Sequence, residues 1–81
     1  MRQLIHTPAQ VGEILRGRRK ARRISQQELA SRLAISQSRL STLEGDPSGL
    51  TLDRLIQLAK LLGLELVLQD KADAPKSKAE W

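Results

Sequence analysis

Two serines, Ser25 and Ser36, lie eleven residues apart, and each opens a segment long enough for a short helix. Serine is favoured at a helix start because its hydroxyl accepts a hydrogen bond from a backbone N–H of the first turn. Only Ala34 and Ile35 remain to make the connection between the two segments. The sequence therefore predicts two short helices that meet at a sharp angle, which is the arrangement of a helix-turn-helix.

A further helix is predicted before this pair, at about residues 8–22. A capping box with proline at the first helical position opens it, formed by Thr7, Pro8 and Gln10. Within it, Gly12 and Gly17 are each expected to weaken the helix by up to roughly 1 kcal/mol relative to alanine.

A fourth helix is predicted between the cap Thr51 and the stop signal Gly63, after a turn at residues 46–49. Its apolar residues follow the 3.6-residue helical period: Leu52, Leu55, Ile56, Ala59 and Leu62.

Residues 64–69 have leucine at every even position and mostly polar residues between, an alternation typical of a strand. A single strand leaves its backbone groups unpaired, and the simplest partner is the same strand of a second copy, antiparallel across a two-fold axis. The predicted dimer residues are Leu64, Leu66, Val67 and Leu68. The alternative is that Leu61, Leu64 and Leu68 continue the fourth helix, but Gly63 and the alternation favour the strand.

The predicted fold class is therefore all-α, with four helices and a C-terminal strand that pairs in a homodimer. We divide the chain into a helix-turn-helix domain at 1–63, a dimerisation strand at 64–70 and a polar tail at 71–81, which is expected to be disordered.

The net charge of +5 is concentrated in the first half of the chain. Residues 1–45 hold nine Lys or Arg and three acidic residues, whereas residues 46–81 hold five and six. Such a one-sided positive field suits a polyanion. Because Trp81 is the only aromatic residue, bases of single-stranded nucleic acid have no stacking platform, and duplex DNA is favoured.

The composition argues against an enzyme. There is no cysteine and one histidine, His6, which has no clustered metal-ligating or catalytic partner and is expected to be a surface or packing residue. No cofactor, metal or small-molecule ligand is predicted. The chain has no apolar run of about 18 residues and no signal peptide, so we expect no membrane contact and a cytoplasmic, nucleoid-associated protein.

With these motifs in hand, residues 8–63 resemble the lambda-repressor/Cro-like helix-turn-helix family, also called the xenobiotic-response-element type. The matching residues are Arg19, residues 24–30 (Ile-Ser-Gln-Gln-Glu-Leu-Ala), residues 35–37 (Ile-Ser-Gln) and residues 43–45 (Leu-Glu-Gly). The resemblance implies an ion pair between Arg19 and Glu44. Arg23 and Ala34 stand where the family usually has glycine. Left-handed backbone at either position would cost of order 1 kcal/mol, unless the turn is rebuilt.

The third helix carries the residues predicted to read DNA bases: Gln37, Ser38, Arg39 and Ser41. The amide of Gln37 can match the N6/N7 edge of adenine, and Arg39 can bind guanine O6 and N7 or a phosphate. The predicted DNA-backbone residues are Ser36, Arg16, Lys20, Arg22, Arg23 and Arg32, together with Gln26, for which the resemblance implies a backbone contact and a brace on Gln37. The alternative is that all of these are only capping and surface residues.

Within this family, the short length, the strand in place of a fifth helix, and the polar tail ending in Glu80 and Trp81 are similar to HipB-type antitoxins. That similarity implies a strand-mediated dimer that represses its own operon and binds a HipA-like serine/threonine kinase toxin. Trp81 would then anchor to the toxin by burying ~150–250 Å²; otherwise it merely lowers solubility. The expected DNA target is a palindromic operator with half-sites ~34–36 Å apart, or two helical turns apart if the dimer holds its heads widely separated. A free-standing phage-type repressor and an interaction module without DNA binding remain as alternatives.

Overall fold

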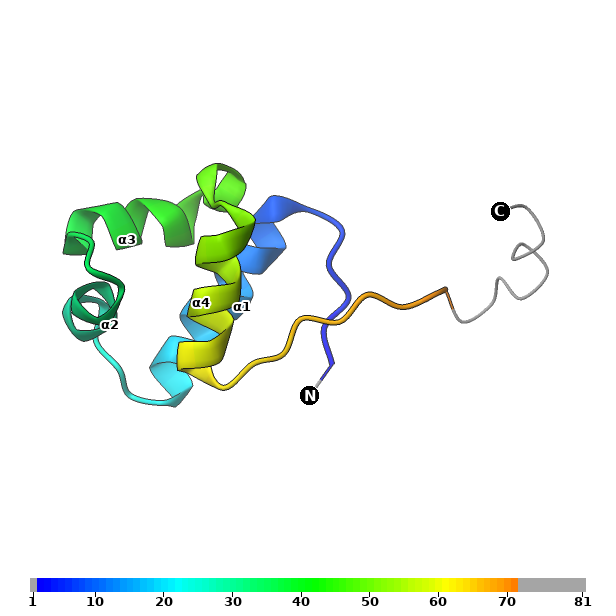
Figure 1. The fold of residues 1–81 in the computed structure, drawn as a ribbon, viewed down its shortest axis with the longest axis horizontal. Coiled ribbons are helices and arrows are strands. Elements are labelled where there is room, and N and C mark those ends of the chain that lie inside the picture. The colour runs from blue at the N-terminus through cyan, green and yellow to red at the C-terminus, as the bar shows by residue number, and fades with distance from the viewer. Residues whose placement is uncertain (1, 72–81) are drawn as a thin grey trace.

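The computed structural model describes residues 2–71, which form four α-helices. In chain order they are α1 (Pro8–Ala21), α2 (Gln26–Leu33), α3 (Gln37–Gly45) and α4 (Leu52–Leu62), with a 3₁₀ turn η1 (Pro47–Gly49) between α3 and α4. Figure 1 shows α1 and α4 at the right of the helical body, α2 at its left and α3 along its upper left. The all-α, four-helix part of the predicted fold is confirmed for residues 2–71. The predicted strand at 64–70 is not confirmed, because residues 2–71 of this single chain contain no strand.

Each predicted helix-start residue caps its helix in the structure. Four side chains accept a hydrogen bond from the backbone N–H three residues further on: Thr7, Ser25, Ser36 and Thr51. The capping box at Thr7 is complete, because the side chain of Gln10 also accepts from the Thr7 backbone N–H at 2.9 Å. At the start of α2 only half of a box forms, since Glu28 directs its carboxylate to Arg32 at 2.8 Å.

The predicted turn at residues 46–49 is occupied by η1. The carboxylate of Asp46 accepts from the Ser48 hydroxyl at 2.7 Å and from the Ser48 backbone N–H at 3.3 Å. These two hydrogen bonds lower the pKa of Asp46, the hydroxyl having the larger effect. The turn is therefore stabilised by local contacts that the Asp-Pro-Ser-Gly sequence itself supplies.

The core consists mainly of leucines contributed by all four helices. Its buried members are Leu15, Leu29, Ala30, Leu33, Leu40, Leu58 and Leu62. On α4 the predicted apolar face is partly wrong, because Leu52 is 68% exposed and Ile56 is 39% exposed, while Leu58 is buried. Apolar residues occupy more than one side of α4, and the sequence does not say which side its neighbours cover.

Gly12 permits the close packing of α1 against the end of α3. A Cβ atom at this position would collide with the carbonyl oxygen of Glu44 and lie 3.3 Å from Cδ of Pro47. Gly17, by contrast, has open space around it. From the sequence alone, both glycines are expected only to weaken α1. In the structure Gly12 also leaves room for the backbone of Glu44, which an alanine would not.

Both positions that lack the glycine typical of the family adopt left-handed backbone. Arg23 has φ 58° and Ala34 has φ 59°. At the second position the N–H of Ala34 donates to Ser31 O at 3.1 Å, and the N–H of Ile35 donates to Ala30 O at 3.0 Å. These bonds close the end of α2. The turn therefore keeps the left-handed geometry, and the side chain of Ala34 is accommodated with strain.

Residues 64–71 follow α4 and run away from the helical body (Figure 1). Gly63 ends α4 in the left-handed conformation, with φ 73°. The alternative in which Leu64 and Leu68 continue α4 is therefore wrong. Leu64 packs against the core, whereas Val67 is 69% exposed and Leu68 is fully exposed. Pairing of this segment with a second copy stays a prediction, and Trp81 lies outside the described residues.

Candidate nucleic-acid interface

The start of α3 presents a set of exposed polar side chains on a capped helix end. Ser36 accepts from the N–H of Arg39 at 3.0 Å, and its hydroxyl lies 3.4 Å from that of Ser38. The four residues predicted to read bases are all exposed: Gln37, Ser38, Arg39 and Ser41. Within residues 2–71, Gln37 and Arg39 form no side-chain hydrogen bond, so their donors and acceptors are free to meet base edges.

A buried ion pair between α1 and the end of α3 holds this helix in place. Arg19 Nε donates to Glu44 Oε2 at 2.7 Å, and Nη2 donates to Oε1 at 3.2 Å. Arg19 is 7% exposed and Glu44 is 4% exposed. The remaining terminal nitrogen of Arg19 donates to Ile24 O at 2.9 Å. One guanidinium thus joins α1, the segment before α2 and the end of α3. The structure brings together the two residues for which the family resemblance implied an ion pair.

Gln26, at the start of α2, also contacts this ion pair. Its amide nitrogen donates to Glu44 Oε1 at 3.0 Å, and the residue is half-buried. The sequence-based expectation was that Gln26 braces Gln37, but the structure directs its amide to Glu44 instead. The start of α2 is therefore held against the end of α3 through a charge-assisted hydrogen bond.

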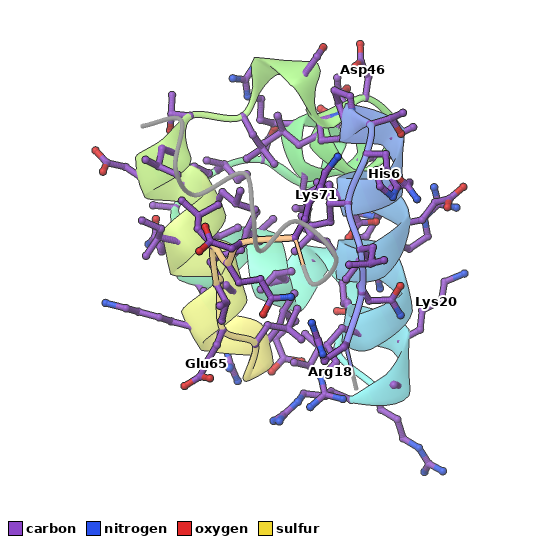
Figure 2. The ribbon with its side chains drawn as sticks, turned by 90° about the vertical axis from the view of Figure 1, so that its right-hand side faces the viewer. His6, Arg18, Lys20, Asp46, Glu65 and Lys71 are labelled. Carbon is purple, nitrogen blue, oxygen red and sulfur yellow. The ribbon has the colours of Figure 1, made fainter. Side chains whose placement is uncertain are left out.

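The basic residues predicted to contact the DNA backbone have different surroundings in the structure. Arg16, Lys20 and Arg23 are exposed, and Figure 2 shows Lys20 projecting from α1 away from the other helices. Arg32 is also exposed, but its guanidinium pairs with Glu28 at 2.8 Å. These four residues remain accessible to a phosphate, although Arg32 would have to share its charge with Glu28.

Arg22 is placed elsewhere. Its guanidinium lies so close to Gly63 that a Cβ at Gly63 would collide with it. In Figure 1 the ends of α1 and α4 meet at the lower edge of the helical body, whereas α3 lies along its upper left. The structure therefore does not bring Arg22 to the start of α3, because its side chain lies beside Gly63 at the end of α4.

Two arginines have roles that the sequence did not suggest. Arg18 Nε donates to Leu62 O at 3.2 Å, and Arg54 Nη1 donates to Leu33 O at 2.9 Å. Figure 2 shows Arg18 between the lower ends of α1 and α4. Each arginine satisfies a carbonyl at the C-terminal end of another helix, where the last carbonyls lack intrahelical partners. The sequence predicts such carbonyls but not which distant cation reaches them.

The part of the chain that the structure describes contains no helix long and apolar enough to cross a membrane.

Comparison with known proteins agrees with this geometry. A family model described as helix-turn-helix matches residues 15–69, which is more than half of the chain. The match includes α2 and α3 with the capped start of α3. A search of curated proteins finds no match.

Two solved structures are similar to this chain over most of its length. A chain of a HipB-O1-O2 complex is 29% identical, covers 85% of this chain and 100% of its own length, and superposes with a TM-score of 0.75. A chain of a HipA-HipB-O2-O3 complex is 28% identical, with coverages of 86% and 99% and a TM-score of 0.76. This chain belongs to the helix-turn-helix family, whose members are DNA-binding regulators rather than enzymes.

Proposed function

We propose that this protein is a sequence-specific DNA-binding antitoxin that represses its own operon and binds a HipA-like serine/threonine kinase toxin. The observation that carries the proposal is the exposed polar start of α3. The buried ion pair of Arg19 and Glu44 holds the other end of this helix in place. The similarity to HipB chains from complexes with O1-O2 and with HipA and O2-O3 supports the same function.

In this proposal α3 enters the major groove of the operator. Gln37 reads adenine and Arg39 reads guanine. Ser38 and Ser41 contact neighbouring bases. Ser36 and Gln26 would contact the DNA backbone at the helix starts. The exposed cations Arg16, Lys20, Arg23 and Arg32 would bind phosphates farther out, and Arg22 is a weaker candidate because of its place beside Gly63.

We further propose that two copies bind one palindromic operator. The dimer would form by antiparallel pairing of residues 64–70 of the two copies. In each copy this segment lies between a helix-turn-helix domain at 1–63 and a tail at 71–81. The exposure of Leu66, Val67 and Leu68 supports this interface, because a partner strand would remove these apolar side chains from water. Half-sites would be ~34–36 Å apart, or twice that distance if the heads are widely separated.

The proposed toxin contact is Trp81, whose indole would insert into a pocket of the kinase. This part of the proposal rests on the likeness to HipB and on the single aromatic residue of the chain.

Selection from randomised DNA duplexes tests the DNA-binding function. Wild-type protein should enrich one palindromic motif at moderate salt. Gln37→Ala and Arg39→Ala should each lower affinity for that motif by about 10–100-fold, the value of a good base contact. Lys60→Ala, which removes an exposed cation from α4, is the control and should change affinity little. If wild-type protein enriches no motif, the proposed function is wrong and a module without DNA binding is favoured.

A pull-down tests the toxin partner separately. Full-length protein and a variant lacking Trp81 are each mixed with a purified HipA-like kinase, and the retained proteins are identified by mass spectrometry. We expect retention of the kinase by the wild type and a strong loss in the variant. Enrichment of a DNA motif without kinase retention would instead identify a free-standing repressor.

A further inference from the structure

Arg54 connects α4 to the turn between the two helices of the motif. Its Nη1 donates to Leu33 O at 2.9 Å. Leu33 is the last residue of α2, and the next residue, Ala34, has the left-handed backbone that turns the chain toward α3. The hydrogen bond therefore acts on the peptide unit at which the direction of the chain changes.

Hydrogen bonds hold Arg54 both at its backbone and at its guanidinium. Its backbone N–H donates to the capping hydroxyl of Thr51 at 3.1 Å, and Nη1 also donates to Gln57 Oε1 at 3.1 Å. The residue is half-buried. A carbonyl at a helix C-terminus carries a partial negative charge, and a guanidinium is well suited to satisfy it. Arg54 thus acts as a brace from α4 to the end of α2.

The same residue lies beside α3. Arg54 and Arg39 line a small cleft of about 110 Å³, together with Leu43 and Thr51. A cation in this cleft has two possible uses: contact with a DNA phosphate, or support of the turn before α3. The hydrogen bond of Nη1 to Leu33 O favours support of the turn.

We propose that Arg54 is a positioning residue for base recognition, which fixes the turn at Ala34 and thereby the angle at which α3 presents Gln37 and Arg39. This inference rests on the proposed DNA binding and deepens it. Arg54 would then influence base preference although it contacts neither a base nor a phosphate. Loss of the brace would let α3 shift relative to α2, so that base contacts weaken while phosphate contacts remain.

The test compares Arg54→Met and Arg54→Lys with Lys60→Met. The control Lys60→Met removes the same charge from an exposed position on the same helix. Affinity for the selected duplex is measured over a range of salt concentrations, at a temperature where circular dichroism shows all proteins to be folded. Base preference is measured by repeating the duplex selection with each variant.

We expect Arg54→Met to lower affinity for the selected duplex about tenfold, the order of one charged hydrogen bond, and to broaden its base preference. The slope of log affinity against log salt should equal that of Lys60→Met. Arg54→Lys should recover part of the preference, since it keeps a donor but not the planar fork. Hydrogen exchange at residues 34–38 of the free protein should be faster in Arg54→Met and unchanged in Lys60→Met.

Three results would overturn the inference. A salt slope shallower by about 0.9 than that of Lys60→Met would assign Arg54 to a phosphate contact. An unchanged base preference in both Arg54 variants would remove the positioning role, and so would unchanged exchange at residues 34–38. If Arg54→Met does not fold, Arg54→Lys alone decides, by its base preference and its exchange. Because these comparisons use a motif selected by the wild type, failure of that selection would count against the proposed function and not against Arg54.

Discussion

At Ala34 the backbone takes up a conformation in which a Cβ atom is crowded by the neighbouring carbonyl oxygen. Ala34→Gly should remove about 1–2 kcal/mol of this strain, while the greater freedom of glycine in the unfolded chain costs about 0.4–1 kcal/mol. We expect a net gain of about 0.5–1 kcal/mol in the free energy of unfolding, measured with urea. Ala9→Gly, in the helical backbone of α1, is the control and should destabilise. A loss of stability in Ala34→Gly would contradict the strained geometry.

The buried pair of Arg19 and Glu44 gives a second prediction at this scale. Glu44→Gln leaves the guanidinium of Arg19 buried without an opposite charge, and breaking such a pair typically costs about 3–5 kcal/mol. That is a large part of the stability of a small domain. Thermal unfolding should show a strongly lowered Tm.

The matched control is Glu28→Gln, which breaks a pair whose two side chains are about half exposed, at 49% and 48%. Solvent screens that pair, so its loss should cost less than about 1 kcal/mol. Equal effects of the two substitutions would mean that the Arg19–Glu44 pair does not hold α3 in place.

At the scale of elements, the two glycines of α1 should respond oppositely to the same substitution. Gly12→Ala inserts a methyl group against the backbone of Glu44 and should destabilise by about 1–3 kcal/mol, as overpacking does. Gly17→Ala meets no atom within 4 Å and should stabilise by up to about 1 kcal/mol through helix propensity. Urea unfolding of both variants measures the difference. Stabilisation by Gly12→Ala would show that α1 and α3 are not closely packed there.

Three arginine side chains connect one element of the fold to another. Arg18, Arg19 and Arg54 each donate to a backbone carbonyl of another segment. Arg18 and Arg19 belong to the basic first half of the chain, so part of the positive charge of that half is used for contacts within the fold and is not available to phosphates. The exposed cations of α1 remain the better candidates for that contact.

At the scale of the whole molecule, the fully exposed Leu68 distinguishes a monomer from the proposed dimer. Leu68→Asp should be neutral in a monomer, but in a strand-paired dimer it should weaken association and make the Tm fall at low protein concentration. Analytical ultracentrifugation measures the association, with Glu65→Asp as the control on the same segment. Wild-type protein that sediments as a monomer at all concentrations would rule out this interface.

Helix starts in this chain could be predicted because their causes are local. Ser36 caps α3 and Thr51 caps α4 through hydrogen bonds that reach only three residues along the chain. The exposed face of α3 could likewise be predicted, since the polar residues that follow Ser36 share one short helix with the buried Leu40. The role of Arg19 was accessible only through resemblance, because its partner is 25 residues away.

The amino-acid sequence by itself determined where the four helices begin and end and which helix start carries the polar side chains proposed to read DNA. The tertiary structure alone decided that Gly12 makes room for the backbone of Glu44, that Leu58 rather than Leu52 is buried, and that Arg54 reaches Leu33. The physical reason is range: caps and periodicity act within one or two helical turns, whereas these contacts exist only after segments distant in the chain have packed together.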